Sequence, residues 1–255
     1  MGDGTRIGRS ASALMTAYRG VLRPGASELL VSEVFGPTLQ GEGPSAGRAA
    51  VFLRLGMCNL ACAWCDTSYT WDRSSHDLAA ELRTTAVVDL VRDVLSRAAP
   101  LVVVTGGEPL LQRTTLLSFV RAVSAAGRRV EFETSGSVAP GGLATLVDRF
   151  VVSPKLSNSR QSERARLRWG VLHEFAALRS TEFKFVVSSP SDLAEVDEIA
   201  ARLALAPQRI WVMPEGTTRE AVIDGLAALA PGVNRRGWSL SGRMHVLLWG
   251  NERAR

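Results

Sequence analysis

Apolar runs alternate with amphipathic segments along the chain from Glu28 onward. Strands are predicted where several apolar residues stand together, many of them β-branched or aromatic. Helices are predicted where apolar residues recur every three or four positions. The predicted strands cover residues 29–35, 51–56, 101–109, 129–136, 149–155, 182–189, 209–217 and 243–250. The predicted helices cover residues 84–98, 114–127, 142–147, 191–205 and 218–230.

This alternation predicts an α/β fold made of parallel βαβ units with right-handed crossovers. About six such units follow Val51, fewer than the eight of a complete barrel. We therefore expect a partial (βα)6 TIM-like barrel, with a doubly wound open sheet as the alternative. No linker divides the chain, so residues 28–255 are expected to form a single domain.

Unusual polar and glycine residues follow directly after several predicted strands. They include a cysteine-rich segment after 51–56, TGGEP at 105–109, ETSG at 133–136 and SPK at 153–155. The carboxyl ends of parallel strands meet at one edge of a barrel, which is the edge that carries active sites. The sequence therefore predicts one site at this edge.

All three cysteines of the chain, Cys58, Cys62 and Cys65, lie within eight residues. An odd number without distant partners does not suit a secreted disulfide scaffold and favours a reducing cytoplasm. Thiolates at such short intervals are typical of a metal centre. Zinc usually has four protein ligands or an open site that includes histidine, whereas three cysteines on a [4Fe–4S] cluster leave one iron open. Both centres remain alternatives, and three buried free thiols are disfavoured.

The net charge of +5 is concentrated at the amino terminus. Residues 1–27 carry four arginines against one aspartate, so the remaining chain is nearly neutral and no nucleic-acid partner is expected. This segment is rich in Gly, Ser and Arg and lacks the apolar stretch of a signal peptide, which predicts a disordered basic extension. No apolar run is long enough to span a bilayer, so no membrane association is expected.

Only two of the 30 basic residues are lysines, Lys155 and Lys184. Lysine is a compact point donor, unlike the planar arginine fork. Its retention at two positions suggests specific roles. Lys155 follows a predicted strand at the site edge. The side chain of Lys184, in FKFVV, faces either the barrel interior or an external ion pair.

The spacing Cys-x3-Cys-x2-Cys after a strand, with Trp64 beside the last cysteine, resembles the radical S-adenosylmethionine (SAM) enzymes. TGGEP after the following strand supports the resemblance. In that family the open iron binds the amino and carboxylate groups of SAM. The resemblance implies that Gly106, Gly107 and Glu108 meet the methionine amino group. A glycine pair permits close backbone approach, and a carboxylate suits an ammonium.

Further segments narrow the resemblance to the 7-carboxy-7-deazaguanine synthases, across essentially residues 29–251. They are LQGEGPSAGR at 39–48, VFLRLGMCNLACAWCDTSYTWD at 51–72, TGGEPLLQ at 105–112, FETSG at 132–136, VVSPKLSNS at 151–159, FKFVV at 183–187 and HVLLWGN at 245–251.

That resemblance implies a reaction on the route to queuosine and other 7-deazapurines. An electron from the cluster cleaves SAM to methionine and a 5′-deoxyadenosyl radical, which takes a hydrogen from C6 of 6-carboxy-5,6,7,8-tetrahydropterin. The ring contracts, ammonia leaves, and 7-carboxy-7-deazaguanine forms while SAM is regenerated. A homodimer and an electron donor such as flavodoxin or ferredoxin are also implied.

Residue roles follow from the same resemblance. Cofactor contacts are expected from Trp64, Cys65, Asp66, Gly106, Gly107, Glu108, Glu133, Ser135, Ser153, Pro154 and Lys155. Substrate contacts are expected from Leu39, Gln40, Gly41, Glu42, Arg54, Thr105 and His245. The [4Fe–4S] cluster is expected on Cys58, Cys62 and Cys65, and Mg2+ on the hydroxyl of Thr67.

Four of these residues have a structural alternative. Arg54 stands inside an apolar strand and needs a partner, which is either the substrate carboxylate or a protein carboxylate. Glu42 accepts from the amino-pyrimidinone edge of the pterin or serves only as a polar turn residue. The Thr67 hydroxyl binds Mg2+, which suits hard oxygen ligands, or closes a local turn. His245 contacts substrate or is structural.

Two other functions remain open from sequence. One is another radical SAM enzyme, such as a glycyl-radical activase, although LQGEG, Arg54 and Thr67 would then lack an obvious purpose. The other is a non-enzymatic zinc or iron–sulfur protein. The alignment of TGGEP with other strand-end motifs argues against it.

Overall fold

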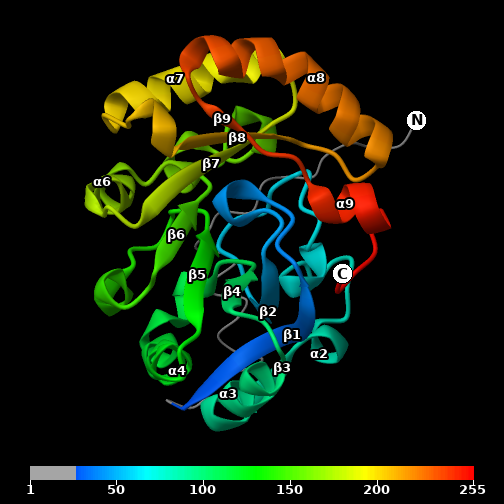
Figure 1. Cartoon of the computed structure of the whole chain (residues 1–255), viewed down its shortest axis with the longest axis vertical. Coiled ribbons are helices and arrows are strands. Elements are labelled where there is room, and N and C mark those ends of the chain that lie inside the picture. Colours follow the sequence, from blue (N-terminus) through cyan, green and yellow to red (C-terminus); the bar gives the residue numbers. More distant parts are fainter. Residues whose placement is uncertain (1–26) are drawn as a thin grey trace.

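The computed structural model describes residues 27–255, whose strands form one curved sheet of nine members (Figure 1). The spatial order is β3-β1-β2-β4-β5-β6-β7-β8-β9. The strand bounds are β1 (Glu28–Leu39), β2 (Ala49–Leu55), β3 (Arg83–Ala86), β4 (Leu101–Gly106), β5 (Arg129–Thr134), β6 (Arg149–Val152), β7 (Thr181–Val187), β8 (Ile210–Pro214) and β9 (Ser239–Leu240). The extension predicted as disordered, 1–27, lies outside the described residues except for its last one.

The strands from β2 to β9 run parallel, apart from β3, as the βαβ pattern predicts. This arrangement agrees with the expected partial barrel. β1 pairs antiparallel with both β2 and β3 at one edge of the sheet. The helix predicted from residue 84 begins only at Val87, because Thr84 and Thr85 pair with β1 as part of β3. β-branched threonines favour such an extended edge.

Helices cover the outer face of the sheet (Figure 1). The longer ones are α3 (Val87–Ser96), α4 (Arg113–Ala125), α6 (Trp169–Ala177), α7 (Leu193–Arg202) and α8 (Arg219–Arg236); the short ones are α2 (Leu78–Glu81), α5 (Glu163–Arg166) and α9 (Met244–Trp249). Their apolar sides pack on alternate strand residues to form the main core. Phe150 of β6 and Phe175 of α6, for example, have ring centroids 5.3 Å apart. No helix in the described part of the chain combines the length and hydropathy that crossing a membrane requires.

The prediction of a last strand at 243–250 is wrong, because this segment forms helix α9. The sequence MHVLLW is a short apolar run, which periodicity alone cannot assign to a strand or a helix. Among its residues Val246 is fully buried. The last strand is instead β9, two residues long. The predicted helix at 142–147 is a 3₁₀ helix, Gly141–Thr145, and α8 continues through the exposed Pro231 to Arg236.

The interior of the barrel is mixed: an apolar cluster on β1, β2 and β4 fills one part, and the loop of residues 40–48, between β1 and β2, fills another with polar contacts. The backbone N–H of Gly43 donates to Ser241 Oγ at 2.7 Å, and Ser45 Oγ donates to Glu131 Oε2 at 2.6 Å. Glu131 lies on the β5 face opposite Val130 and Phe132, which belong to the outer core. The loop is thus fixed by side chains that point inward from the strands.

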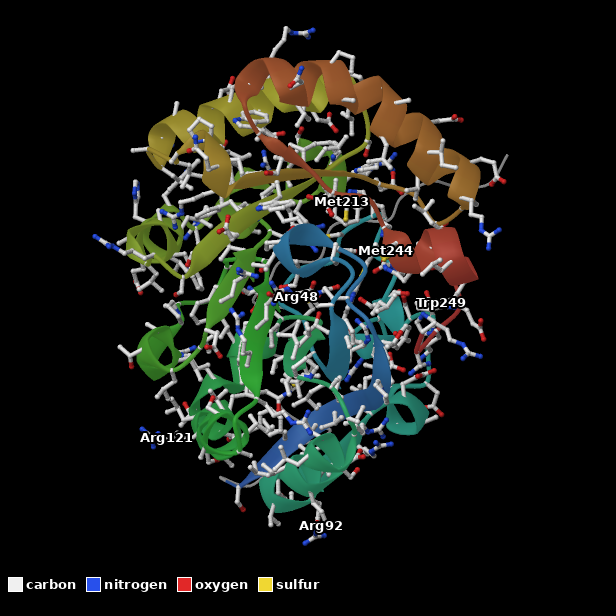
Figure 2. All side chains as sticks on the ribbon, viewed as in Figure 1. Arg48, Arg92, Arg121, Met213, Met244 and Trp249 are labelled. Carbon is white, nitrogen blue, oxygen red and sulfur yellow. The ribbon has the colours of Figure 1, made fainter. Side chains whose placement is uncertain are left out.

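Two arginine side chains of the outer helices point away from the sheet. Arg92 of α3 and Arg121 of α4 project into solvent, as Figure 2 shows. These side chains account for part of the basic bias without forming a site.

Candidate active site

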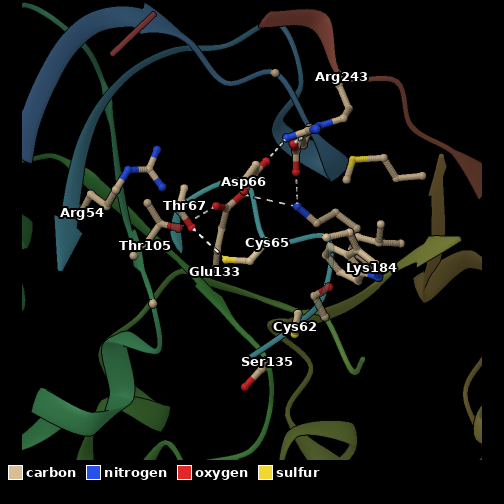
Figure 3. A pocket seen from close by; sticks show the side chains of 18 of the residues that line it. Arg54, Cys62, Cys65, Asp66, Thr67, Thr105, Glu133, Ser135, Lys184 and Arg243 are labelled. Atoms are coloured by element: carbon tan, nitrogen blue, oxygen red, sulfur yellow. Dashed lines mark hydrogen bonds and ion pairs between the residues drawn. The ribbon is translucent and has the colours of Figure 1, made fainter. Parts of the chain in front are cut away.

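A cavity of about 230 Å³, open to solvent, lies at the carboxyl ends of the parallel strands (Figure 3). All three cysteines line it. The other sequence-predicted residues along its wall are Leu39, Gln40, Gly41, Glu42, Arg54, Trp64, Asp66, Thr67, Thr105, Gly106, Gly107, Glu133, Ser135, Ser153, Lys155 and His245. Glu108 and Pro154 are buried outside the wall. The strand-end motifs therefore share one cavity, as the sequence predicts.

The cysteine loop follows β2 and is held from the other side of the cavity by the segment after β6. The N–H of Ala63 donates to the carbonyl of Ser159 at 3.1 Å. Gln161 makes two hydrogen bonds to the backbone of Ala61: its amide nitrogen donates to the carbonyl at 2.6 Å, and its oxygen accepts from the N–H at 3.3 Å. These bonds tie the cysteine loop to the segment after β6.

Two N–H groups point at cysteine sulfurs. The backbone N–H of Leu60 donates to Cys58 Sγ at 3.4 Å, and the Trp71 indole donates to Cys65 Sγ at 3.3 Å. Burial raises the pKa of the Cys58 thiol well above its usual range and raises the pKa of Cys62 to about 11. Both groups therefore need a cationic centre bound to them in order to become thiolates at neutral pH.

Gly107 of TGGEP lies against the cysteine loop. A Cβ at this position would stand 2.1 Å from the carbonyl oxygen of Met57 and 2.9 Å from Cys58 Cβ. The neighbouring Glu108 N–H donates to the same Met57 carbonyl at 2.8 Å. The glycine is required here because two backbones meet.

The Glu108 carboxylate is fully buried and faces the end of β5. It accepts hydrogen bonds from Thr134 Oγ1 at 2.7 Å, from the Ser135 N–H at 2.9 Å, from Ser135 Oγ at 2.6 Å and from the Leu110 N–H at 3.1 Å. Burial raises its pKa despite these donors. The carboxylate thus braces the site in this structure, and its contact with a methionine amino group stays a prediction.

The cysteine arrangement suits a cluster better than a single metal ion. In the described part of the chain, no three His, Cys, Asp or Glu residues are placed to hold one ion. A zinc site needs its ligands around one point. A cube bonds each cysteine to a different iron, so the thiolates need only surround a larger volume. Cys58, Cys62 and Cys65 all line one cavity, and N–H donors are directed at two of the sulfurs.

Thr67 lies beside this cluster site. It precedes the 3₁₀ helix η2 (Ser68–Thr70), and its hydroxyl makes no capping hydrogen bond to that helix. Thr70 Oγ1 closes the turn instead by donating to the Thr67 carbonyl at 2.8 Å. Thr67 Oγ1 faces the cavity, 3.7 Å from Cys65 Sγ, where a hard cation can reach it.

Arg54 has a protein partner as well as access to the cavity. Its Nε donates to Glu33 Oε1 at 2.7 Å across the β1–β2 pair. Tyr69 also donates to Glu33, at 2.9 Å, and Arg253 forms an ion pair with it at 3.0 Å. Burial raises the pKa of Glu33, but Arg54 and the other donors bring it below its ordinary value. Arg54 therefore pairs with a protein carboxylate through its Nε, and the residue also lines the cavity.

Glu133, at the end of β5, joins residues expected to contact substrate. Its carboxylate accepts from Gln40 Nε2 at 3.1 Å and from Thr105 Oγ1 at 2.9 Å. The two expected binding regions, for cofactor and for substrate, thus touch in the structure.

A chain of alternating charges crosses the cavity (Figure 3). Lys184 Nζ lies 2.5 Å from Glu42 Oε2 and 3.6 Å from Glu133 Oε1. Arg243 Nε lies 3.0 Å from Glu42 Oε1, and another nitrogen of the same guanidinium contacts Asp66. Burial alone raises the pKa of Glu42, but Lys184 and Arg243 hold it far below its ordinary value. Lys184 therefore faces the barrel interior.

His245 on α9 packs directly against Gly41. A Cβ on Gly41 would stand 2.1 Å from His245 Nδ1, and the Met244 N–H donates to the Gly41 carbonyl at 2.8 Å. Burial lowers the pKa of His245. The ring lines the cavity although the segment is a helix rather than the predicted strand.

Sequence reasoning missed Arg243 and left Lys184 undecided. The sequence does contain a signal for Lys184. It stands between Phe183 and Phe185 in β7, so its side chain points to the opposite, inner face of the sheet. Arg243 had none, because its partners Asp66 and Glu42 lie 177 and 201 residues away in sequence.

Comparisons with known proteins agree with this geometry. Residues 54–157 match the radical SAM superfamily. The 7-carboxy-7-deazaguanine synthase of Pyrobaculum aerophilum is 36% identical over 88% of this chain and 96% of its own length. That of Hyperthermus butylicus is 34% identical over 95% and 99%. The crystal structure of QueE from Escherichia coli matches with a TM-score of 0.66 and 28% identity, covering 84% of this chain and 93% of that one. The chain belongs to the 7-carboxy-7-deazaguanine synthase family of radical SAM enzymes.

Proposed function

We propose that the protein converts 6-carboxy-5,6,7,8-tetrahydropterin to 7-carboxy-7-deazaguanine with loss of ammonia, in the biosynthesis of queuosine and related 7-deazapurines. One observation carries the proposal: the three cysteines and the polar residues 39–42, Arg54 and Thr105 line the same cavity. A cofactor on the cysteines is thereby adjacent to a pocket for a small polar substrate.

The cysteines would hold the [4Fe–4S] cluster, and SAM bound to it supplies the 5′-deoxyadenosyl radical that removes a substrate hydrogen. The chain itself binds and orients the reactants. Gly106 and Gly107 line the cavity beside the cysteine loop, where their backbone would meet the methionine end of SAM. Glu133, Ser135 and Lys155 offer polar groups along the remaining SAM-side wall.

The substrate end is built for a carboxylate and an amino-pyrimidinone. Arg54 borders the cavity with the nitrogens not used by Glu33, and a guanidinium can pair with a carboxylate through two parallel hydrogen bonds. Glu42 is ionised and lines the same cavity together with Gln40, so it can accept from neighbouring N–H groups. These two residues would orient the ring with its carboxylate toward Thr67.

The Thr67 hydroxyl would be a ligand of Mg2+, which would supply positive charge for the substrate carboxylate. The support is that this hydroxyl faces the cavity and is not used by the adjacent turn. Magnesium keeps several waters, so one protein ligand suffices. A homodimer, reduction by a flavodoxin or ferredoxin, and a cytoplasmic location belong to the same proposal.

The test is turnover by anaerobically purified protein with a reconstituted cluster, given SAM, reductant, Mg2+ and 6-carboxytetrahydropterin. Carboxydeazaguanine, identified by mass spectrometry, is the expected product. An intact cluster that cleaves SAM without forming this product would contradict the proposed substrate. A protein that binds only zinc under these conditions would contradict the enzyme assignment itself.

A further inference from the structure

Glu42 is held by two cations that come from distant parts of the chain. Lys184 on β7 pairs with one carboxylate oxygen, and Arg243, just before α9, pairs with the other. Both cationic side chains are less than one-tenth exposed, and that of Glu42 is 14% exposed. Two independent contacts therefore fix the direction in which the carboxylate points.

Each cation is itself fixed by a second group. Lys184 Nζ lies 3.6 Å from Glu133, and Arg243 donates to the Gly216 carbonyl at 2.6 Å and contacts Asp66. Burying charged groups costs free energy that ion pairs often only balance. A pair of apolar side chains would fill this space more cheaply, so the charges point to a functional requirement.

The placement at the cavity strengthens this argument. The barrel interior contains another ion pair, between Glu131 of β5 and Arg149 at the start of β6, with an N–O distance of 3.4 Å. That pair borders a different pocket, near the amino ends of the strands, and is distant from the cysteines in the fold. Of these two ion-paired carboxylates, only Glu42 lines the cavity that contains the cysteines.

We propose that Lys184 and Arg243 are positioning residues that act through Glu42, holding its carboxylate so that it accepts from the paired N–H donors of an amino-pyrimidinone ring. The inference rests on the proposed function, because that ring belongs to the proposed substrate. Neither cation need touch the substrate. Their contribution to substrate affinity should therefore disappear when Glu42 no longer carries a charge.

A double-mutant cycle tests this dependence. The four proteins are wild type, Glu42→Gln, Lys184→Met and the double variant, each with a reconstituted cluster and SAM. Binding of 6-carboxytetrahydropterin is measured by anaerobic calorimetry. Loss of a hydrogen bond to a charged group should weaken binding by about 10- to 100-fold for each single variant. The double variant should lie within about twofold of Glu42→Gln, since the effects of residues acting as a unit do not add.

Arg243→Met in the same cycle provides an independent route if Lys184→Met does not fold, which circular dichroism and thermal melting will show. Arg236→Met and Asp197→Asn are the matched controls, because they break an ion pair between α8 and α7, with an N–O distance of 2.7 Å, whose members do not line the cavity. The controls should lower the melting temperature while leaving pterin affinity within about twofold of wild type.

Additive losses in either cycle would overturn the inference, since they would mean that the cation contacts substrate directly or acts elsewhere. Equal affinity loss in the Arg236 and Asp197 controls would also overturn it, by showing a general effect of losing an ion pair. If wild type itself does not bind the pterin, the proposed function fails instead. A KM increase with nearly unchanged kcat in Lys184→Met would agree with positioning for binding.

Discussion

Replacing Gly107 with alanine should displace the cysteine loop. The new methyl carbon would stand 2.1 Å from the Met57 carbonyl oxygen, and the tightest Cβ contacts in proteins are near 3.0 Å. The oxygen must therefore retreat by almost 1 Å. It is a backbone atom that also accepts from the Glu108 N–H at 2.8 Å, so it cannot rotate away as a side chain could.

The expected cost is about 3 kcal/mol, at the upper end of the usual penalty for overpacking. For a chain of this size that corresponds to a fall in melting temperature of roughly 6–12 °C. Cys58 follows Met57 directly, so the same displacement should reduce the iron retained after anaerobic reconstitution. Differential scanning fluorimetry of the metal-free protein and iron and sulfide analysis measure the two effects separately.

Gly170→Ala is the matched control, because no heavy atom lies within 4 Å of its added methyl group and the residue is in helix α6. It should leave cluster content unchanged and stabilise the helix slightly. If Gly107→Ala kept the melting temperature and the iron content of wild type, the argument that close packing requires this glycine would be refuted.

Three further predictions concern the site. Thr67→Ala should raise the Mg2+ concentration needed for half-maximal turnover by about 10-fold or more, and the cluster should be retained. Thr67→Ser, which keeps the hydroxyl, should not raise it. Loss of iron in Thr67→Ala would show instead that Thr67 has a structural role. Trp71→Phe removes the N–H donor to Cys65 Sγ and should shift the cluster potential about 20–60 mV more negative in a spectroelectrochemical titration, whereas Trp211→Phe should leave it unchanged. Because the pKa of Glu42 is lowered in the folded state, its stabilising contribution is complete above the ordinary value of 4.5 and is lost as pH falls below it. Glu42→Gln should therefore flatten the acid limb of a melting-temperature profile, and an unchanged slope would contradict the assigned pKa.

The parts of the fold that could be predicted from the sequence are those with local signals. The parallel strands and outer helices follow from apolar periodicity, and the shared cavity follows from polar residues at strand ends. The short apolar run at α9 had no decisive period, and it was assigned wrongly. Edge strand β3 was missed because two threonines before an amphipathic helix also suit the helix start.

The cysteines and TGGEP were predictable for a similar reason, since each is a contiguous motif. The partners of Glu42 were not, because an ion pair leaves no trace in the sequence around either member. For Lys184 there were two signals: lysine is rare in this chain, and its alternation with Phe183 and Phe185 in β7 directs it to the inner face of the sheet. Arg243 is one arginine among many, and only the folded chain brings it to Glu42 and Asp66.

The barrel interior explains why these charges matter to a loop far from them in sequence. A complete barrel fills its interior with layers of apolar side chains. Here the loop of residues 40–48 enters that space, and Glu131, Glu133 and Lys184 point at it from the strands. The loop has no regular structure beyond one short 3₁₀ helix, so its conformation depends on those contacts. The orientation of Gln40 and Glu42 toward the cavity is therefore set by strand residues, and substitutions inside the barrel should alter substrate binding without touching the substrate.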